Sequence, residues 1–270
     1  MSVRDIKLIS LELLLSIIMK LILCSPNKND LEIVEEYKVY YSLNSTLQVF
    51  RQYSDSDFVR HMLNTFIAHC PRKPSEVYCE RRHPFIVIEG THRPVRRIVS
   101  KMLARKISGK LLYNPPRYMV RNKEYFNNTL ALRRAFFSLG VYGTSYKARQ
   151  LVSLKPVVVG GYFLDQVTFG IYKKTDHIPC LNSPVFKWPE ELLVPDLIFY
   201  IQTPTLSPPT NVSIRTEERT QRILKLYQCW KEVRTIEIKT THKYAEITQL
   251  IIKSINKELN KTYVENVIQS

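Results

Sequence analysis

The pattern of hydrophobic and polar positions changes character near residue 83. Before it, apolar residues recur at spacings of three and four in "NDLEIVEEYKVYYSLNSTLQVFRQY" and "DSDFVRHMLNTFIAHC", which predicts amphipathic helices. Asp55 or Ser56 is placed to cap the second helix. The segment "CPRKPSEVYCERRHP", with three prolines and a cluster of charges, is typical of a domain boundary. We therefore divide the chain into an N-terminal helical extension, residues 1–83, and a second domain, residues 84–270.

After residue 84, short apolar runs alternate with helical patterns. The runs "PFIVIEG", "KLLYNPP", "PVVVGGY", "PDLIFYIQ" and "VRTIEIK" have the length and continuous hydrophobicity of strands buried on both faces. Helical patterns follow in "PVRRIVSKMLARKI", "LALRRAFFSLGVYGTSYKARQLV", "RTEERTQRILKLYQCW" and "YAEITQLIIKSINKEL". This alternation predicts an α/β fold, with a parallel five-stranded sheet covered by helices on both faces. In such folds ligands bind at the carboxyl ends of the strands.

The apolar N-terminal stretch "LISLELLLSIIMKLILC" carries a narrow polar stripe at Glu12, Ser16 and Lys20. This spacing predicts a helix that docks on a protein core. The stretch is too short and too interrupted to span a bilayer, so we expect no membrane span.

The charge balance narrows the class of partner. The 270 residues include 40 Lys and Arg against 24 Asp and Glu, a formal charge of +16, and such a field attracts nucleotides, nucleic acid or acidic membrane. The five cysteines are odd in number and lack the paired spacing of zinc sites. We therefore expect reduced thiols, no bound metal, and an intracellular location in the cytoplasm or mitochondrion.

Five segments carry a resemblance to a known family. "HPFIVIEG", "LRRAFFSLGVY", "PVVVGGY", "SPVFKWPEELLVPDLI" and "RTEERTQRI" resemble the thymidylate kinase family, and more closely its mitochondrial UMP-CMP kinase branch. The resemblance begins near Ile67 and continues almost to the C-terminus. It implies a P-loop-kinase-like fold and ATP-dependent phosphorylation of a nucleoside monophosphate. Relatives of this type are commonly dimers, so a homodimer is one expectation.

The turn after the first strand departs from the resembled family. Members carry G-x-x-x-x-G-K-[ST] there, in which backbone amides surround phosphate, Lys reaches the outer phosphates and a hydroxyl holds magnesium. In this chain Val95 replaces the second glycine, Arg96 the lysine and Arg97 the hydroxyl residue, and Pro94 removes an amide donor. The phosphate-loop remnant consists of Gly90, Thr91, Arg93, Arg96 and Arg97.

Two further departures affect the resembled catalytic groups. Gly160 and Gly161 stand where related kinases have Asp-Arg, and Asp165 would have to reach back from the next helix, so we do not count it as a site residue. Only a short segment separates Ile223 from Arg234, which leaves no room for an arginine-bearing lid.

The acceptor side keeps more of the resembled pattern. The candidates are Arg134, Phe137 and Tyr142, and the resemblance assigns to Phe137 the aromatic that stacks on the nucleobase. Phe137 can equally be a core aromatic, because helix-spaced aromatics usually pack inside. Arg133 and Arg134 are more often surface charges than ligands at such positions.

Three hypotheses follow. The first is a nucleoside-monophosphate-kinase-like protein that has lost efficient catalysis and acts as a nucleotide-binding or scaffold protein, with no catalytic residue and no cofactor. The second is an active dTMP or UMP-CMP kinase that uses ATP and magnesium, with Arg93, Arg96 and Arg97 gripping phosphates at a helix N-terminus. The third is a basic nucleic-acid-binding protein, using "RYMVRNKEYF" and "RPVRRIVSKMLARK".

Overall fold

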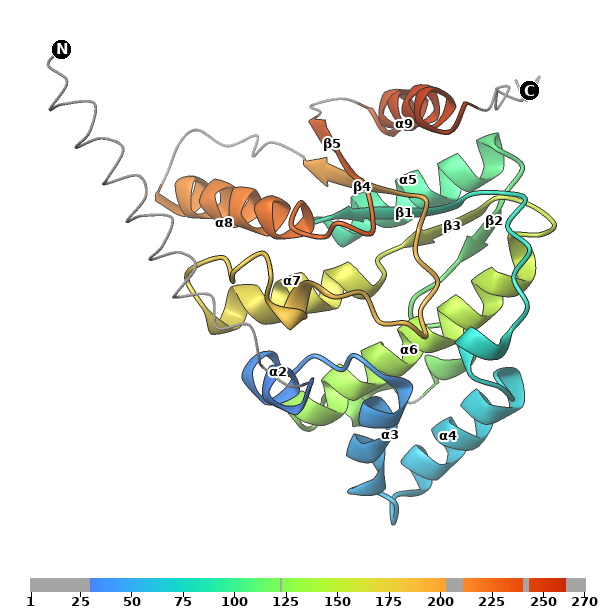
Figure 1. Cartoon of the computed structure of the whole chain (residues 1–270), viewed down its shortest axis with the longest axis vertical. Coiled ribbons are helices and arrows are strands. Elements are labelled where there is room, and N and C mark those ends of the chain that lie inside the picture. The colour runs from blue at the N-terminus through green and yellow to red at the C-terminus, as the bar shows by residue number, and fades with distance from the viewer. Residues whose placement is uncertain (1–29, 122, 203–210, 240–242, 261–270) are drawn as a thin grey trace, which may run out of the picture.

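A parallel five-stranded sheet forms the centre of the computed structural model, which describes residues 30–121, 123–202, 211–239 and 243–260 (Figure 1). The strand order is β2-β3-β1-β4-β5, with parallel pairing throughout. The strands are β1 (Phe85–Gly90), β2 (Lys110–Leu112), β3 (Val157–Gly160), β4 (Leu197–Gln202) and β5 (Thr235–Lys239). The predicted α/β sheet is therefore confirmed, and each observed strand lies within one of the predicted apolar runs.

Helices cover both faces of the sheet, and the alternation of side chains along β1 shows how. Ile86 and Ile88 pack toward α5 (Arg93–Lys106) and α9 (Tyr244–Leu259). Phe85 and Val87 belong to the larger core on the opposite face, which is covered by α6 (Leu130–Leu151), α7 (Phe163–Lys174) and α8 (Asn211–Tyr227). Both faces of the central strand are apolar because both are covered.

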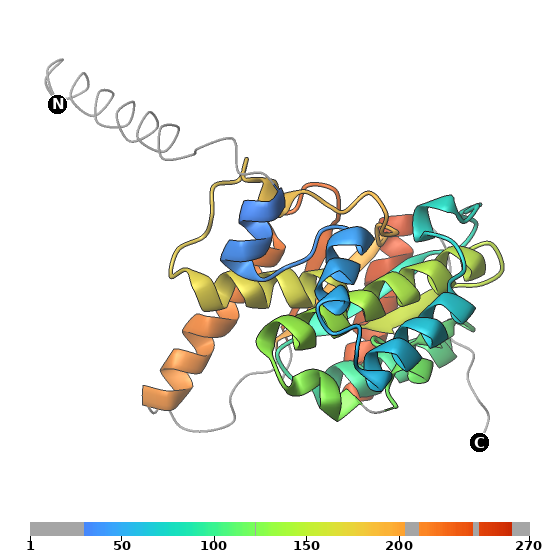
Figure 2. The ribbon, with the colours of Figure 1, turned by 90° about the horizontal axis from the view of Figure 1, so that it is seen from below.

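The N-terminal helices form a further layer outside α6 and α7 (Figures 1 and 2). They are α2 (Asp30–Tyr37), α3 (Leu43–Arg51) and α4 (Asp57–His69). The hydroxyls of Thr46 on α3 and Ser138 on α6 are 3.0 Å apart in a buried contact, and the Phe50 ring meets that of Phe126 edge to face. The extension thus contributes to the same core as the sheet. Short 3-10 helices occupy Pro74–Glu76, Arg117–Met119, Lys123–Asn127 and Pro184–Phe186.

Local details of the extension differ from the expectation. The first predicted helix is divided into α2 and α3, and Lys38 at the break has a φ of +50°. Ser56 is the N-cap residue of α4, although its side chain makes no capping hydrogen bond. The apolar stretch that we expect to dock lies outside the described residues. No described helix is both long and apolar enough to cross a membrane.

The described cysteines agree only in part with the expectation of reduced thiols. Cys70, Cys79 and Cys229 are free. Cys180 is disulfide-bonded, so for this residue the expectation is wrong. Odd number and irregular spacing along the chain are no guide to which cysteines meet in space.

Candidate functional site

A cavity of about 680 Å³ opens at the carboxyl ends of the strands, where ligands bind in open α/β sheets. Its walls come from β1, β2, β3 and β4 and from α5, α6, α7 and α8. The lining includes every residue of the phosphate-loop remnant, both glycines after β3, and two of the three acceptor candidates: Gly90, Thr91, Arg93, Arg96, Arg97, Gly160, Gly161, Arg134 and Phe137.

The turn between β1 and α5 is only two residues long. β1 ends at Gly90 and α5 begins at Arg93, so only Thr91 and His92 lie between them. Pro94 stands in the first helical turn, a position that favours helix initiation. The residues that would form an open phosphate-binding arch are therefore already helical.

The glycine that this turn retains has a packing role. Gly90 has a φ of +139°, and a Cβ there would lie 2.4 Å from the backbone carbonyl oxygen of Ile201 on β4. A side chain is excluded by the neighbouring strand, whether or not phosphate binds. The survival of Gly90 is thus explained without a nucleotide.

Arg96, which stands in the position of the phosphate-binding lysine, is held by two carboxylates. Its Nη1 donates to Glu89 Oε2 at 2.9 Å and to Asp165 Oδ1 at 2.7 Å. The side chain of Arg96 is only 8 % exposed and that of Glu89 is fully buried. The second oxygen of Glu89 accepts from the backbone N–H of Tyr162 at 2.9 Å. This guanidinium is therefore neutralised by the protein itself.

We call Arg96, Glu89 and Asp165 the triad. Its electrostatics follow from its composition, which is two carboxyl groups and one guanidinium. Burial and, to a smaller extent, the nearby Asp165 carboxylate raise the pKa of Glu89, the Arg96 guanidinium opposes them, and the net result is a pKa of about 8. For Arg96, burial lowers the pKa, but the carboxylates of Asp165 and Glu89 raise it above its ordinary value. The triad contains one acid more than its cation can neutralise, so the buried carboxyl group holds its proton more tightly than an ordinary glutamate.

Part of the triad occupies the space beside Gly161, one of the two positions where related kinases have Asp-Arg. Gly161 has a φ of +84°, and a Cβ there would lie 3.4 Å from Arg96 Nη1 and 3.6 Å from Asp165 Oδ2. The Arg96 guanidinium thus lies where the first atoms of a side chain at position 161 would project. Asp165, which the sequence did not favour as a site residue, does reach the site. The interpretation of Asp165 is corrected because the first turn of α7 faces the turn after β1.

Three other cations of the cavity lining have no carboxylate partner among the described residues. Arg93, Arg97 and Arg133 are exposed and line the cavity, and no ion pair found among the described residues involves any of them. Lys123 and Arg219 also line it; neither was selected from the sequence, because isolated cations on helices and turns carry no specific signal. Among the described residues of the lining, Asp165 is the only acidic one.

The acceptor candidates Arg134 and Phe137 lie together on the α6 wall. Arg134 donates to the backbone oxygen of Gln166 at 3.2 Å and lies 5.2 Å from the centre of the Phe169 ring. Burial lowers its pKa. Phe137 is partly buried and meets Phe136 edge to face at 5.5 Å. One face of the cavity therefore combines aromatic rings with cations.

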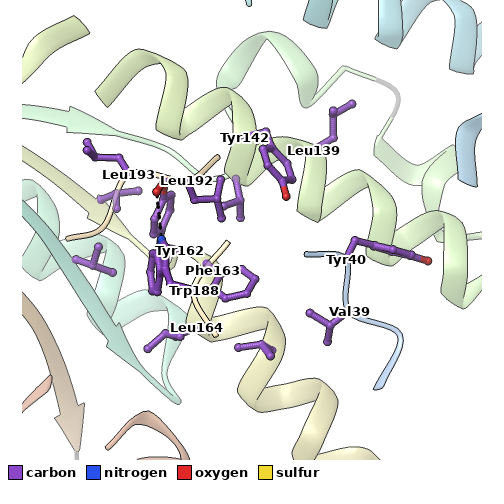
Figure 3. Close-up of a cluster of buried hydrophobic side chains, with 14 of the residues drawn as sticks. Val39, Tyr40, Leu139, Tyr142, Tyr162, Phe163, Leu164, Trp188, Leu192 and Leu193 are labelled. Carbon is purple, nitrogen blue, oxygen red and sulfur yellow. Dashed lines mark hydrogen bonds between the residues drawn. The ribbon is translucent and has the colours of Figure 1, made fainter. Parts of the chain in front are cut away.

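The third acceptor candidate, Tyr142, lies elsewhere. It is 1 % exposed and does not belong to the cavity lining. Figure 3 shows it in the core with Leu139, Leu192 and Tyr162. Burial raises its pKa well above the ordinary value, and its hydroxyl has no hydrogen-bond partner in the described part of the protein. Its place in the structure is that of a core aromatic.

The connection after α8 agrees with the absence of a lid at this point of the chain. α8 ends at Tyr227 and β5 begins at Thr235, so seven residues, 228–234, join them. They contain turns and no helix. The long segment before α8 lies mostly outside the described residues.

Comparisons with known proteins agree with the sequence resemblance. No protein-family model matches the chain. The human protein "UMP-CMP kinase 2, mitochondrial" is 32 % identical over 143 residues, which cover 51 % of this chain and 29 % of the human protein. A solved thymidylate kinase from Candida albicans aligns over 66 % of this chain and 93 % of its own, with 17 % identity and a TM-score of 0.48. The chain is thus similar over about half its length to the human UMP-CMP kinase and spans less than a third of that protein's length.

Proposed function

We propose that this protein belongs to the thymidylate-kinase-like nucleoside monophosphate kinases by descent, and that it binds a nucleotide without efficient phosphoryl transfer. The observation that carries this proposal is the triad of Arg96, Glu89 and Asp165. The cation that should meet the outer phosphates is committed to two carboxylates, one of which is fully buried. A buried pair of this kind is not released easily, because an unpaired buried charge is costly.

The remaining requirements for phosphoryl transfer are also unmet. Catalysis of this reaction depends on positioning and on stabilising charge. The turn at Thr91 and His92 supplies no arch, Arg97 cannot ligate magnesium, and no lid lies between α8 and β5. Losing one good stabiliser costs roughly a hundred-fold or more in rate, so the combined loss leaves little activity.

Binding, in contrast, is supported by the cavity. Its volume of about 680 Å³ falls in the range of small-molecule sites. Phe137 offers a ring for the base, while Arg93, Arg97 and Arg133, which form no ion pair within the described ranges, offer guanidinium groups for phosphate. The occupant that fits this combination is a nucleoside phosphate, with its base toward α6 and its phosphate toward the start of α5.

The experiment that tests this proposal measures binding and turnover on one preparation. Calorimetry with dTMP, UMP and CMP is expected to show binding to the cavity. Incubation with ATP and magnesium plus each monophosphate is expected to yield no ADP above the level without protein. Absence of binding by all three, or steady formation of ADP and a nucleoside diphosphate, would contradict the proposal.

An active kinase is the second candidate, and one observation favours it. Arg93 and Arg97 line the cavity at the N-terminus of α5, where anions are attracted by the helix end. Arginines there could grip ATP without the usual loop. The turnover assay separates the two candidates, because the second requires ADP formation that depends on the acceptor.

The compartment and the assembly belong to the same proposal. The cytoplasm or the mitochondrion is supported by the three free described cysteines, and the mitochondrion by the name of the human relative. The disulfide of Cys180 argues against both compartments, because disulfides are rare inside cells. A homodimer is retained from the resemblance alone.

A further inference from the structure

A row of four cations runs along the exposed side of α5. Arg93, Arg97, Lys101 and Arg105 follow one another at every fourth residue, and all four are exposed. With a rise of 1.5 Å per residue, neighbours are about 6 Å apart along the axis and the row is about 18 Å long. We call these residues the α5 row. Arg93 and Arg97 line the cavity, and Lys101 and Arg105 continue away from it.

The α5 row is unfavourable for the helix that carries it. Like charges at i and i+4 destabilise a helix, and Arg93 at the first position also opposes the helix dipole. α5 contains no acidic residue. None of the ion pairs found in the described ranges involves the four cations. A local conflict of this kind marks a functional surface more often than a structural one.

The cavity behind the row has two polar groups that no atom of the described residues satisfies. Ser100 and Tyr200 are each 1 % exposed and line the cavity. Neither hydroxyl has a hydrogen-bond partner in the part of the chain that the structure describes. Buried hydroxyls are normally paired, so these two groups leave the inner wall of the cavity polar and unsatisfied by the described residues. The site therefore has an inner polar end and an outer cationic track.

We propose that the cavity and the α5 row together capture the 3′ end of a single-stranded nucleic acid. This inference rests on the proposed function, which places a base near Phe137 and a phosphate near Arg93 and Arg97. In a 3′-terminal nucleotide that same 5′-phosphate is the link to the preceding nucleotide. A strand whose last nucleotide occupies the cavity therefore leaves along the α5 row, where Lys101 and Arg105 meet the next phosphates.

The polarity of the strand follows from this geometry. A 5′-terminal nucleotide in the same orientation would have to continue from its 3′ oxygen, on the side of the sugar away from the α5 row. The cavity, at about 680 Å³, is within the size range of single small-molecule sites, so we place one terminal nucleotide in it. Recognition works by charge and by stacking of one base, so it needs no particular sequence.

Fluorescence anisotropy tests the inference with oligo(dT) and oligo(U) of about twelve nucleotides, a length within the range that one binding fold covers. Because an oligonucleotide contacts both the cavity and the α5 row, we expect it to bind about a hundred-fold more tightly than the mononucleotide. A bulky biotin on the 3′ oxygen should weaken binding about tenfold, the effect of losing one stacked base. The same group on the 5′ end should change nothing.

The salt dependence of oligonucleotide binding identifies the cations that contact phosphate. Each neutralised phosphate of a single strand contributes about −0.7 to the slope of log K against log salt, so four contacts predict a slope of about −3. The double variant Lys101→Ala/Arg105→Ala should reduce its magnitude by about 1.4 and leave mononucleotide binding unchanged. Lys253→Ala/Lys257→Ala on α9 removes the same charge from another exposed helix surface and should leave the slope unchanged.

The outcomes separate this inference from the proposed function. If mononucleotides bind but neither oligonucleotide binds more tightly, the inference is overturned and the proposed function stands. Equal binding of the 3′-blocked and free strands, or equal loss of slope in the α9 control, also overturns it, because binding would then reflect net charge alone. If no mononucleotide binds, the proposed function itself has failed.

Discussion

The two ends of the cavity use arginine in opposite ways. At the β1 end, Arg96 is almost fully buried and is neutralised by Glu89 and Asp165. At the mouth and along α6, Arg97 and Arg133 are exposed and lack carboxylate partners among the described residues. The same side chain is part of the scaffold in one place and available to a ligand in the other. Burial and partners, rather than residue type, decide which cations can bind phosphate.

Replacing Arg96 tests the scaffold end and should have the largest effect. Arg96→Ala leaves Glu89 and Asp165 beside each other without their cation, which is expected to lower the free energy of unfolding by about 3 to 5 kcal/mol. The matched control, Arg97→Ala, should change it by no more than about 0.5 kcal/mol. Urea unfolding followed by circular dichroism measures both. Equal stability of the two variants would mean that Arg96 is as free as its neighbour.

Gly90→Ala distinguishes a packing glycine from a phosphate-binding one. A Cβ would meet the Ile201 carbonyl oxygen at 2.4 Å, with φ at +139°. We expect a loss of about 2 to 3 kcal/mol in unfolding free energy, since strained backbone of this kind costs of that order. The measurement is made without nucleotide. If Gly90→Ala were as stable as the unchanged protein without nucleotide, Gly90 would have the phosphate-binding role of a loop glycine instead.

Arg97→Ala tests the ligand end. Loss of one charge-assisted hydrogen bond, worth about 1.5 to 3 kcal/mol, is expected to weaken binding of the nucleoside monophosphate at least about tenfold. Calorimetry measures the affinity, and Lys253→Ala on the exposed side of α9 is the control of equal charge. Unaltered affinity in Arg97→Ala would place the phosphate elsewhere.

The pH dependence of stability gives the most specific signal. Because the pKa of Glu89 rises from 4.5 to about 8 on folding, the folded protein holds this proton more tightly than the unfolded chain. The contribution is present below pH 4.5 and is lost as pH rises toward 8. Glu89→Gln should therefore reduce the decline of unfolding free energy between pH 5 and 8, as measured by urea titrations. An identical pH profile in the two proteins would show that Glu89 does not titrate there.

The fold could be predicted from the sequence because its strands have a distinct hydrophobic pattern. Runs such as "PFIVIEG" and "PDLIFYIQ" contain four or more consecutive apolar residues, which is typical of strands in a sheet covered on both faces. The division of the first helical stretch at Lys38 was missed, since the helical periodicity continues through the break. The helix α7 was expected only as the element after the third strand.

The site could be predicted in its location but not in its chemistry. Motif comparison identified the turn after β1 and the two glycines after β3. It missed Glu89, although a single acid at the end of an apolar strand was a usable signal. It could not foresee that Arg96 pairs with Asp165, 69 positions away, because such a contact depends on how α7 packs. Tyr142 looked like its neighbours on α6 and lies in the core.

A crystal structure with a nucleoside monophosphate, a non-hydrolysable ATP analogue and magnesium tests the central claim most directly. The account predicts one monophosphate in the cavity, with its phosphate at Arg93, Arg97 or Arg133. The hydrogen bonds from Arg96 to Glu89 and Asp165 should be unchanged, with no triphosphate at the turn. A triphosphate and its metal held by residues 90–97, with Arg96 withdrawn from Glu89, would contradict it.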